Sequence, residues 1–184
     1  KYIKEVAALS IRYAQVIKEK ADLVENKVIY PNTRLGAQLA IVAELIAGGL
    51  ETPVYLTSIG GFDTHANQAT SHANLLTTVA QAIEAFQKDL KLLGIDDKVV
   101  LMTFSEFGRR LNENGSAGTD HGTAAPLFII GRNVYGGVYG NNPDLSDLDN
   151  SGDIKYKYDF RQLYATLLTQ QLGMPVERMP DVLM

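Results

Sequence analysis

The sequence predicts an α/β fold in which helices flank a parallel-type sheet. Three short apolar runs indicate strands, because strands buried on both faces read as continuous apolar segments; these runs cover 54–58, 99–104 and 126–130. A helix is expected over 72–93, between the first two runs. A strand, a helix and a second strand form a βαβ unit, whose strands run parallel. The length of 184 residues suits one compact domain over 1–184.

Four helices are expected, each from its apolar periodicity and from the residues at its ends. Gly48 and Gly49 follow the second helix, as a left-handed C-terminal cap would require. Ser71 is the expected N-cap of the third helix, and Asp159 is the expected N-cap of the fourth. The expected ranges are 3–20, 33–47, 72–93 and 160–172.

Composition excludes several classes of function. The formal net charge of −4 argues against nucleic acid as a partner, because phosphate backbones bind basic surfaces. No apolar run reaches the length of about 18 residues that a membrane span needs. The chain has no Cys, which excludes disulfides and thiolate metal sites. It opens with Lys1 inside an expected helix, so we expect a piece of a longer protein, with any targeting segment outside it.

Candidate metal ligands lie in two loops that follow predicted strands. In open α/β sheets, ligands bind at the carboxyl ends of the strands, which here are the loops 59–71 and 105–125. Imidazole and carboxylate groups that meet at one sheet edge form a ligand set for zinc or a similar divalent ion. Several such residues gathered in the two loops favour a metal site more strongly than any one of them does alone. The candidates are Asp63, His65, Glu106, Asp120 and His121.

Simpler roles stay open for the individual residues. Asp63 could cap a turn through its own backbone. Glu106 could form an ion pair with Arg109 or Arg110. His72, the remaining histidine, falls in the first turn of a predicted helix and is the weakest candidate ligand.

Two other kinds of site have less support. The acidic stretch 147–154 has the alternating oxygens of a calcium loop, but Tyr158 stands where the bidentate Glu belongs. A plain acidic turn before the last helix is the better interpretation. A dinucleotide site is set aside, because no Gly-x-Gly-x-x-Gly opens a helix after a strand.

Four motifs lie around these residues: Gly-Gly-Phe-Asp-Thr-His at 60–65, Ser-Glu-Phe-Gly-Arg at 105–109, Thr-Asp-His-Gly-Thr at 119–123 and Asp-Phe-Arg-Gln-Leu-Tyr-Ala-Thr-Leu-Leu at 159–168. Together they resemble a bacterial family, domain of unknown function 1501. The similarity extends from about Tyr30 to Pro175. The family resembles a sulfatase-like branch of the alkaline phosphatase superfamily, which implies an alkaline-phosphatase-like fold with this chain as its C-terminal part.

The superfamily binds two metals, and its pattern can be laid on this chain in two registers. In one, Asp120-His121-Gly122 is the superfamily's Asp-His-Gly element. In the other, that element corresponds to 105–108, because it should directly follow a buried strand. We prefer the second register, in which His121 is the final ligating His. One metal is then held by Asp63, His65 and His121, and Glu106 is a ligand of the second.

The resemblance implies metal-dependent hydrolysis of a small-molecule phosphate or sulfate ester. Esters of carbohydrates are among the candidate substrates. Zinc is the first choice of cation, with manganese or calcium as alternatives, and Arg109 would bind the ester oxygens. The superfamily's nucleophile lies in an N-terminal half outside this chain, and the hydroxyls near the ligands have no evident activating base. The resemblance also implies a periplasmic or secreted protein.

The alternative is a non-catalytic secreted or envelope protein that keeps the fold with a degenerate or purely structural metal site. Phe107 favours this alternative, because it stands where the superfamily has a ligating His. The second metal would therefore lack one ligand.

Overall fold

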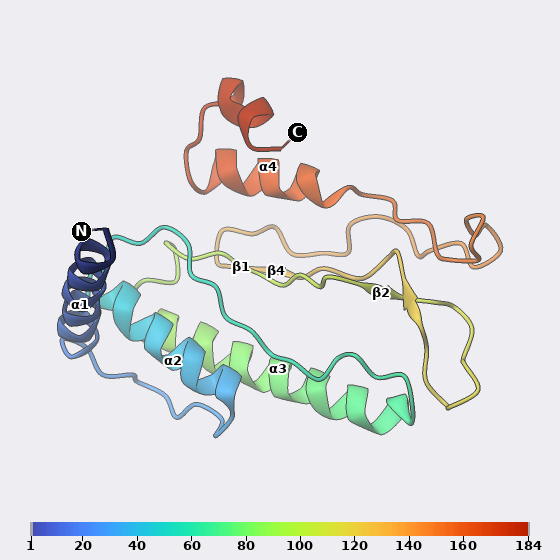
Figure 1. Cartoon of the computed structure of the whole chain (residues 1–184), viewed down its shortest axis with the longest axis horizontal. Coiled ribbons are helices and arrows are strands. Elements are labelled where there is room, and N and C mark those ends of the chain that lie inside the picture. Colours follow the sequence, from blue (N-terminus) through green and yellow to red (C-terminus); the bar gives the residue numbers. More distant parts are fainter. Residues whose placement is uncertain (1, 184) are drawn as a thin grey trace. The chain divides into compact units, whose positions relative to one another are not determined.

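The computed structural model describes residues 2–183 and divides them into two compact units. The first unit contains 2–63 and Ser71–Val99, and the second contains Thr64–Thr70 and 100–183. Figure 1 shows the order of the elements along the chain. They are α1 (Tyr2–Ala21), α2 (Arg34–Ala47), α3 (Gln68–Leu92), β1 (Leu101–Met102), β2 (Gly108–Arg109), β3 (His121–Gly122), β4 (Ile129–Ile130), α4 (Phe160–Gln170) and the 3-10 helix η1 (Val176–Asp181).

Helices α1 and α2 confirm the first two helical predictions. The hydroxyl of Thr33 caps α2 by accepting a hydrogen bond from the Gly36 amide at 3.1 Å. After Ala47, the left-handed residue is Gly49, with a φ of 76°, whereas Gly48 stays near the helical region. Gly48 is needed for a different reason: a Cβ there would lie 2.1 Å from the Lys20 carbonyl oxygen, at the end of α1.

Helix α3 begins earlier than predicted, so Ser71 is not its N-cap. Its start is fixed at Gln68, whose amide donates to the Ala117 carbonyl at 2.9 Å. The preceding Asn67 has a φ of 46°, and its amide donates to Ser116 O at 3.0 Å. These contacts satisfy amides that a helix start leaves without intrahelical partners. A distant loop, which the sequence pattern could not show, therefore sets the boundary.

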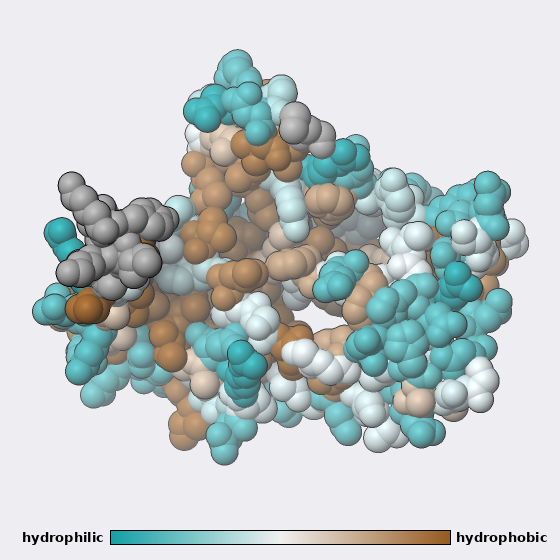
Figure 2. Space-filling view, in the orientation of Figure 1, coloured by the Kyte–Doolittle hydropathy of each residue, from teal (hydrophilic) through white to brown (hydrophobic). Residues whose placement is uncertain are grey.

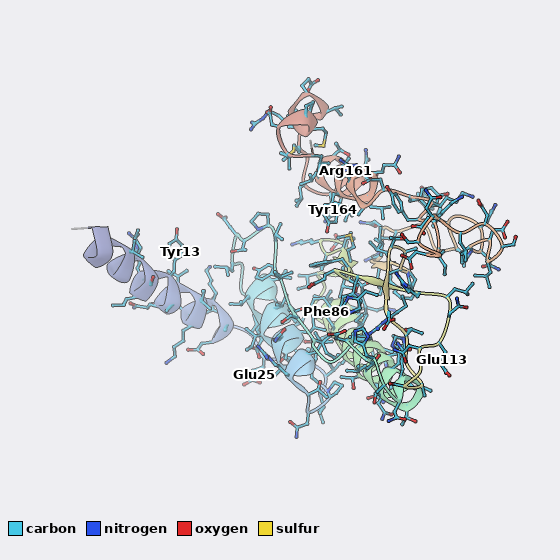
Figure 3. All side chains as sticks on the ribbon, turned by 45° about the vertical axis from the view of Figure 1, so that its right-hand side comes forward. Tyr13, Glu25, Phe86, Glu113, Arg161 and Tyr164 are labelled. Atoms are coloured by element: carbon cyan, nitrogen blue, oxygen red, sulfur yellow. The ribbon has the colours of Figure 1, made fainter. Side chains whose placement is uncertain are left out.

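The buried apolar core among the described residues lies entirely in the first unit. Phe86, labelled on α3 in Figure 3, is 2% exposed and is the largest apolar side chain in it. The second unit has no fully buried large apolar side chain in its described part. The core residues are Leu35, Leu39, Ala43, Leu45, Ala82, Ala85, Phe86, Leu90 and Ile95.

A buried carboxylate joins α3 to the segment between α1 and α2. Asp89 is fully buried, and its Oδ1 accepts a hydrogen bond from the Lys27 amide at 2.6 Å. Its Oδ2 accepts from Asn26 Nδ2 at 2.9 Å and from the Tyr30 hydroxyl at 3.0 Å. Three donors thus offset the loss of hydration that burial imposes on the charge.

The prediction of a parallel-type, alkaline-phosphatase-like sheet flanked by helices is wrong. The strands form two separate two-stranded sheets, and both are antiparallel. Strand β1 pairs with β4 in the register Leu101↔Ile130 and Met102↔Ile129. The runs 99–104 and 126–130 therefore do contain strands, but these strands pair with each other.

The run 54–58 explains the error. These residues, all within the described range, form no strand, and Val54 and Leu56 are 65% and 77% exposed. The Ser58 amide donates to the Gln38 side chain at 2.9 Å and not to a neighbouring strand. An apolar run signals that a segment favours burial, but it does not identify a partner strand or its direction. Without this strand there is no βαβ unit.

Helix α4 confirms the last predicted helix and its cap. The Asp159 carboxylate accepts from the Arg161 amide at 2.9 Å, and Figure 3 labels Arg161 and Tyr164 on this helix. The Arg161 guanidinium also donates to Asp159, and these bonds lower the pKa of that carboxyl to about 2.

The surface carries many apolar side chains, which appear as brown residues on the face shown in Figure 2. Ile29, Tyr135 and Val138 are each at least 88% exposed. Across residues 2–183, no helix combines the length and the apolarity that crossing a membrane requires.

Candidate metal centre

The β2–β3 hairpin positions His121. Arg109 pairs with His121 and Gly108 pairs with Gly122, which brings two of the predicted motifs into one ladder. Both glycines are required by close packing. A Cβ at Gly108 would lie 1.9 Å from the Ala124 carbonyl oxygen, and one at Gly122 would lie 2.6 Å from that of Arg109. The glycines of the motifs therefore let His121 lie beside the loop that follows β1.

A second contact brings the His65 loop to the segment 114–118, within the second unit. Besides the backbone bonds of Asn67 and Gln68 to this segment, the Thr119 hydroxyl donates to Gln68 Oε1 at 2.9 Å. Gly118 is buried against the His65 backbone. Ala117 has a φ of 55°, an unfavourable value for a residue with a Cβ, so the surrounding bonds hold a strained turn here.

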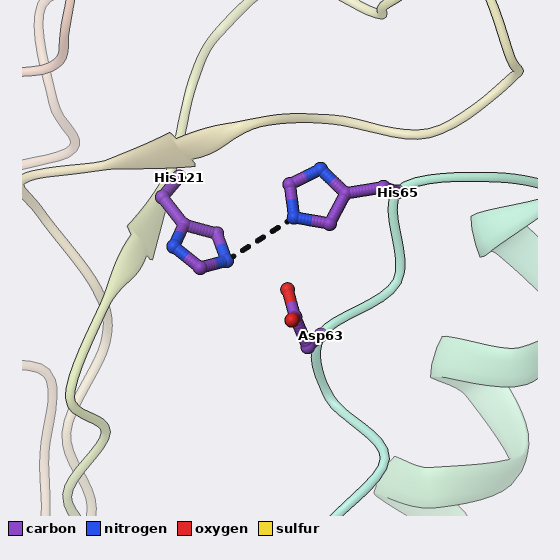
Figure 4. Close-up of side chains that lie close together, drawn as sticks. All are labelled: Asp63, His65 and His121. Atoms are coloured by element: carbon purple, nitrogen blue, oxygen red, sulfur yellow. Dashed lines mark hydrogen bonds between the residues drawn. The ribbon is translucent and has the colours of Figure 1, made fainter.

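These contacts place the two imidazoles next to each other, as Figure 4 shows. Nε2 of His65 lies 3.3 Å from Nε2 of His121, and the ring centroids are 4.9 Å apart. A tetrahedral zinc ion with Zn–N distances of about 2.0–2.1 Å separates two nitrogen ligands by about 3.3–3.4 Å. The two nitrogens therefore have the spacing that one shared cation requires.

Asp63 supplies a carboxylate to the same place. One residue separates it from His65, so its position beside that imidazole is a local property of the chain. Asp63, His65 and His121 each offer a ligand atom, and these atoms all lie within 4.8 Å of one another. All three residues are exposed. The structure thus confirms that a possible metal-binding triad exists, and its donor set of two imidazoles and one carboxylate fits a divalent cation.

Asp120 orients His65. Its Oδ1 lies 3.1 Å from His65 Nδ1. This contact favours the tautomer with the proton on Nδ1, which offers the lone pair of Nε2 to a cation. The hydrogen bond from Asn114, and then that from His65, lower the pKa of the Asp120 carboxyl. Asp120 therefore stays ionised at neutral pH and contacts a candidate ligand through its carboxylate.

Phe107 packs on His121. Their rings are stacked with centroids 3.9 Å apart and an angle of 5° between the planes. The Arg109 guanidinium carbon lies 5.1 Å from the centroid of the Phe107 ring. Phe107, which stands where the resemblance places a ligating His, thus fixes the plane of the His121 imidazole.

The other predicted site residues, Glu106, Asp120 and Arg109, are not members of the triad, and Asp120 contacts His65 instead. Glu106 is exposed and is not one of its members. Arg109 donates to the Thr119 carbonyl, and also to the Thr64 hydroxyl at 3.4 Å, so it joins the two loops. Arg110, a possible partner of Glu106, forms an ion pair with the buried Asp153 at 3.3 Å.

The acidic stretch 147–154 has the contacts of a turn. Asp149 Oδ1 accepts hydrogen bonds from the amides of Ser151 and Asp153 at 2.8 and 2.9 Å. Asp147 pairs with Lys155 at 2.5 Å. Backbone and side-chain donors of the chain itself thus occupy these carboxylates, which agrees with the interpretation as a turn.

Asn114 is a site residue that the sequence did not identify. Its side chain contacts both Asp120 and the His65 backbone. The Asn114-Gly115 pair signals a turn, but nothing in the sequence connects that turn to a histidine 49 residues away. The role of Phe107 was missed for a similar reason, since stacking depends on how the hairpin folds.

Comparison with known proteins gives one family match. No curated protein and no solved structure matches this chain. Residues 20–180 match the family described as "Protein of unknown function (DUF1501)". This range covers most of the chain and includes every residue of the centre, so the protein belongs to that family.

Proposed function

We propose that this protein binds a zinc ion through Asp63, His65 and His121 and takes part in the hydrolysis of a phosphate or sulfate ester. The observation that carries the proposal is the 3.3 Å separation of the two Nε2 atoms, with a carboxylate oxygen in the same group. Asp120, by orienting His65, supports the same assignment.

The donor set favours zinc over the other cations. Two imidazole nitrogens and one carboxylate oxygen match the ligands of zinc sites that keep one position open. Calcium takes six to eight oxygen ligands, and two of the three groups here are nitrogen donors. Manganese accepts this donor set but prefers carboxylate, carbonyl and water ligands in an octahedral arrangement. Zinc therefore needs the fewest additional ligands.

Exposure of the triad favours catalysis over a closed structural site. Structural zinc sites are completed by four protein ligands, whereas catalytic sites have three and leave room for substrate or water. A divalent cation held here would act as a Lewis acid for an ester oxygen. The positive charge of Arg109, which lies on the strand paired with His121, favours an anionic substrate.

The attacking group is proposed to be water or a hydroxyl from another part of the protein. The hydroxyl of Ser105 donates to the Phe107 carbonyl at 2.8 Å, and that of Thr64 accepts a bond from Arg109. The resemblance of the motifs to the alkaline phosphatase superfamily supports the ester class.

A second candidate function is a non-catalytic protein with a single structural metal. The stacking of Phe107 on His121 favours it, because the position expected to ligate a second cation is occupied by a packing residue. Activity separates the two candidates, since both bind a cation at the same triad.

The test measures metal content and zinc affinity of the full chain by mass spectrometry and chelator competition. We expect about one zinc ion per chain, and His121→Ala and Asp63→Ala are each expected to lower the affinity at least about 100-fold. His72→Ala is the matched control, because His72 is not a member of the triad.

Hydrolysis of p-nitrophenyl phosphate and p-nitrophenyl sulfate is then assayed with and without zinc. Zinc-dependent hydrolysis that is lost in His121→Ala supports the first candidate. Zinc binding without hydrolysis of either ester favours the second. A folded chain that binds no divalent cation would contradict both.

A further inference from the structure

The side-chain amide of Asn114 uses all of its hydrogen-bonding capacity. An amide has two N–H donors and an oxygen with two acceptor positions. Asn114 Nδ2 donates to the His65 carbonyl at 3.0 Å and to Asp120 Oδ1 at 3.2 Å. Its Oδ1 accepts from the amides of Ser116 and Gly118 at 2.9 and 3.2 Å. Four partners thus converge on one side chain that is not itself a candidate ligand.

The two donor bonds reach the centre by different routes. One holds the backbone of His65, a candidate ligand. The other holds the same Asp120 oxygen that contacts His65 Nδ1. The amide therefore constrains both the position of the His65 main chain and the group that orients its imidazole. The two acceptor bonds hold the turn that carries Gly118 against His65.

Other common side chains cannot make this set of bonds. An Asp at this position would keep the acceptor oxygen but lose both donors, and its charge would face the Asp120 carboxylate. An Ala would leave the His65 carbonyl, Asp120 and two backbone amides without this partner. Asn112, two residues earlier in the same loop, is exposed and provides a matched comparison.

We propose that Asn114 is a positioning residue of the cation centre, which sets the geometry of His65 through its backbone and through Asp120. This inference rests on the proposed zinc site. Asn114 touches neither cation nor substrate, so it acts on affinity and coordination geometry through other groups. Loss of such outer partners typically lowers metal affinity 10–100-fold.

The first experiment measures the zinc affinity of the full chain by chelator competition. Asn114→Ala is expected to lower the affinity about 10–100-fold, whereas Asn112→Ala stays within about twofold of the wild type. The visible absorption of bound Co²⁺ reports the ligand geometry. We expect altered bands in Asn114→Ala at saturating Co²⁺ and unchanged bands in Asn112→Ala.

A double-mutant cycle separates positioning from general stability. In an Asp120→Ala background, Asn114→Ala is expected to lower the affinity by a smaller factor than in the wild type, because the part of its effect that passes through Asp120 is already lost. An equal loss in both backgrounds, with unchanged Co²⁺ bands, would overturn the proposal. Asn114→Asp keeps the acceptor oxygen for the turn, so it tests the donors even if Asn114→Ala does not fold; wild-type affinity in this variant also overturns the proposal.

The outcome for the wild type distinguishes the two proposals. If the wild-type chain binds no zinc or cobalt, the proposed metal site is itself wrong. If it binds and the Asn114 variants bind equally well, the site stands and the role of Asn114 is wrong.

Discussion

At the scale of single residues, the centre depends on a close approach of two backbones. Gly118 lies against the peptide that joins His65 to Ala66, and a Cβ at this position would be 2.3 Å from the His65 carbonyl carbon and 2.4 Å from its oxygen. Such contacts cannot be accommodated by a rotamer change, because the neighbouring atoms are backbone. The His65 peptide would have to move, and the imidazole would move with it.

Gly118→Ala is therefore expected to destabilise the second unit by about 1–3 kcal/mol and to weaken zinc binding. Gly115→Ala is the control, because a Cβ there meets nothing within 4 Å. Neither glycine has a positive φ, so the comparison isolates the steric effect. Urea unfolding and zinc titration measure both quantities. Equal behaviour of the two variants would contradict the close approach.

Residue type and loop position together selected five candidate ligands, of which Asp63, His65 and His121 form the triad. The chain has three histidines, and His65 and His121 lie next to carboxylates in two loops, which selected them together with Asp63 although the strand predicted before His65 does not form. The contacts around them could not be predicted. Asn114 looks like any turn residue, and the stacking of Phe107 depends on a hairpin that the sequence did not indicate.

At the scale of elements, helices were predictable and sheet pairing was not. The periodicity of a helix is local, and its caps are short-range contacts, as Thr33 and Asp159 illustrate. A strand needs a partner that can be far away in the chain. The apolar runs 99–104 and 126–130 gave two correct strand positions, yet their antiparallel pairing came only from the structure.

The contact of Tyr30 with Asp89 gives an element-scale prediction, since it fastens the segment before α2 to α3. Burial first, and then the Asp89 charge, raise the pKa of the Tyr30 hydroxyl. In the unfolded chain this hydroxyl ionises near pH 10. Above that pH the folded state holds a proton that the unfolded state has lost, so the free energy of unfolding falls as pH rises.

We expect the free energy of unfolding to fall less steeply with pH in Tyr30→Phe than in the wild type. The two slopes should differ by less than about 1.4 kcal/mol per pH unit, because Tyr30 is only half-buried. At neutral pH the variant should be less stable, because Asp89 loses a donor. Urea unfolding at pH 9, 10 and 11, followed by circular dichroism at 222 nm, measures both effects. Tyr13→Phe is the control, since Tyr13 is 66% exposed on α1. Parallel pH profiles for wild type and Tyr30→Phe would contradict the prediction.

At the scale of the whole molecule, the two units are stabilised differently. The buried apolar side chains found among the described residues belong to the first unit. The described part of the second unit relies on two short antiparallel strand pairs, on α4 and on hydrogen bonds between loops. A unit with little apolar core is one to which a bound metal can add much of the stability. The βαβ prediction assumed one continuous core around one sheet, and this distribution of burial does not fit that assumption.

Because His65 and His121 lie in the second unit, zinc is expected to stabilise that unit more than the core of the first. A ligand that binds only the folded state, and is present at 100 times its Kd, adds about 2.7 kcal/mol to the free energy of unfolding. Hydrogen exchange should slow at the amides of Asn67, Gln68 and Arg110, whose acceptors are Ser116, Ala117 and Asp120. The Ile95 amide, bonded to Leu90 in the core of the first unit, serves as the internal control.

His121→Ala should abolish the zinc-dependent protection and leave exchange at Ile95 unchanged. Equal slowing of exchange at Ile95 and at the three amides of the second unit would contradict this difference between the units. Protection that persists in His121→Ala would show that the cation is held elsewhere. Because the readout requires no substrate, it tests the location of the metal independently of whether the centre hydrolyses an ester.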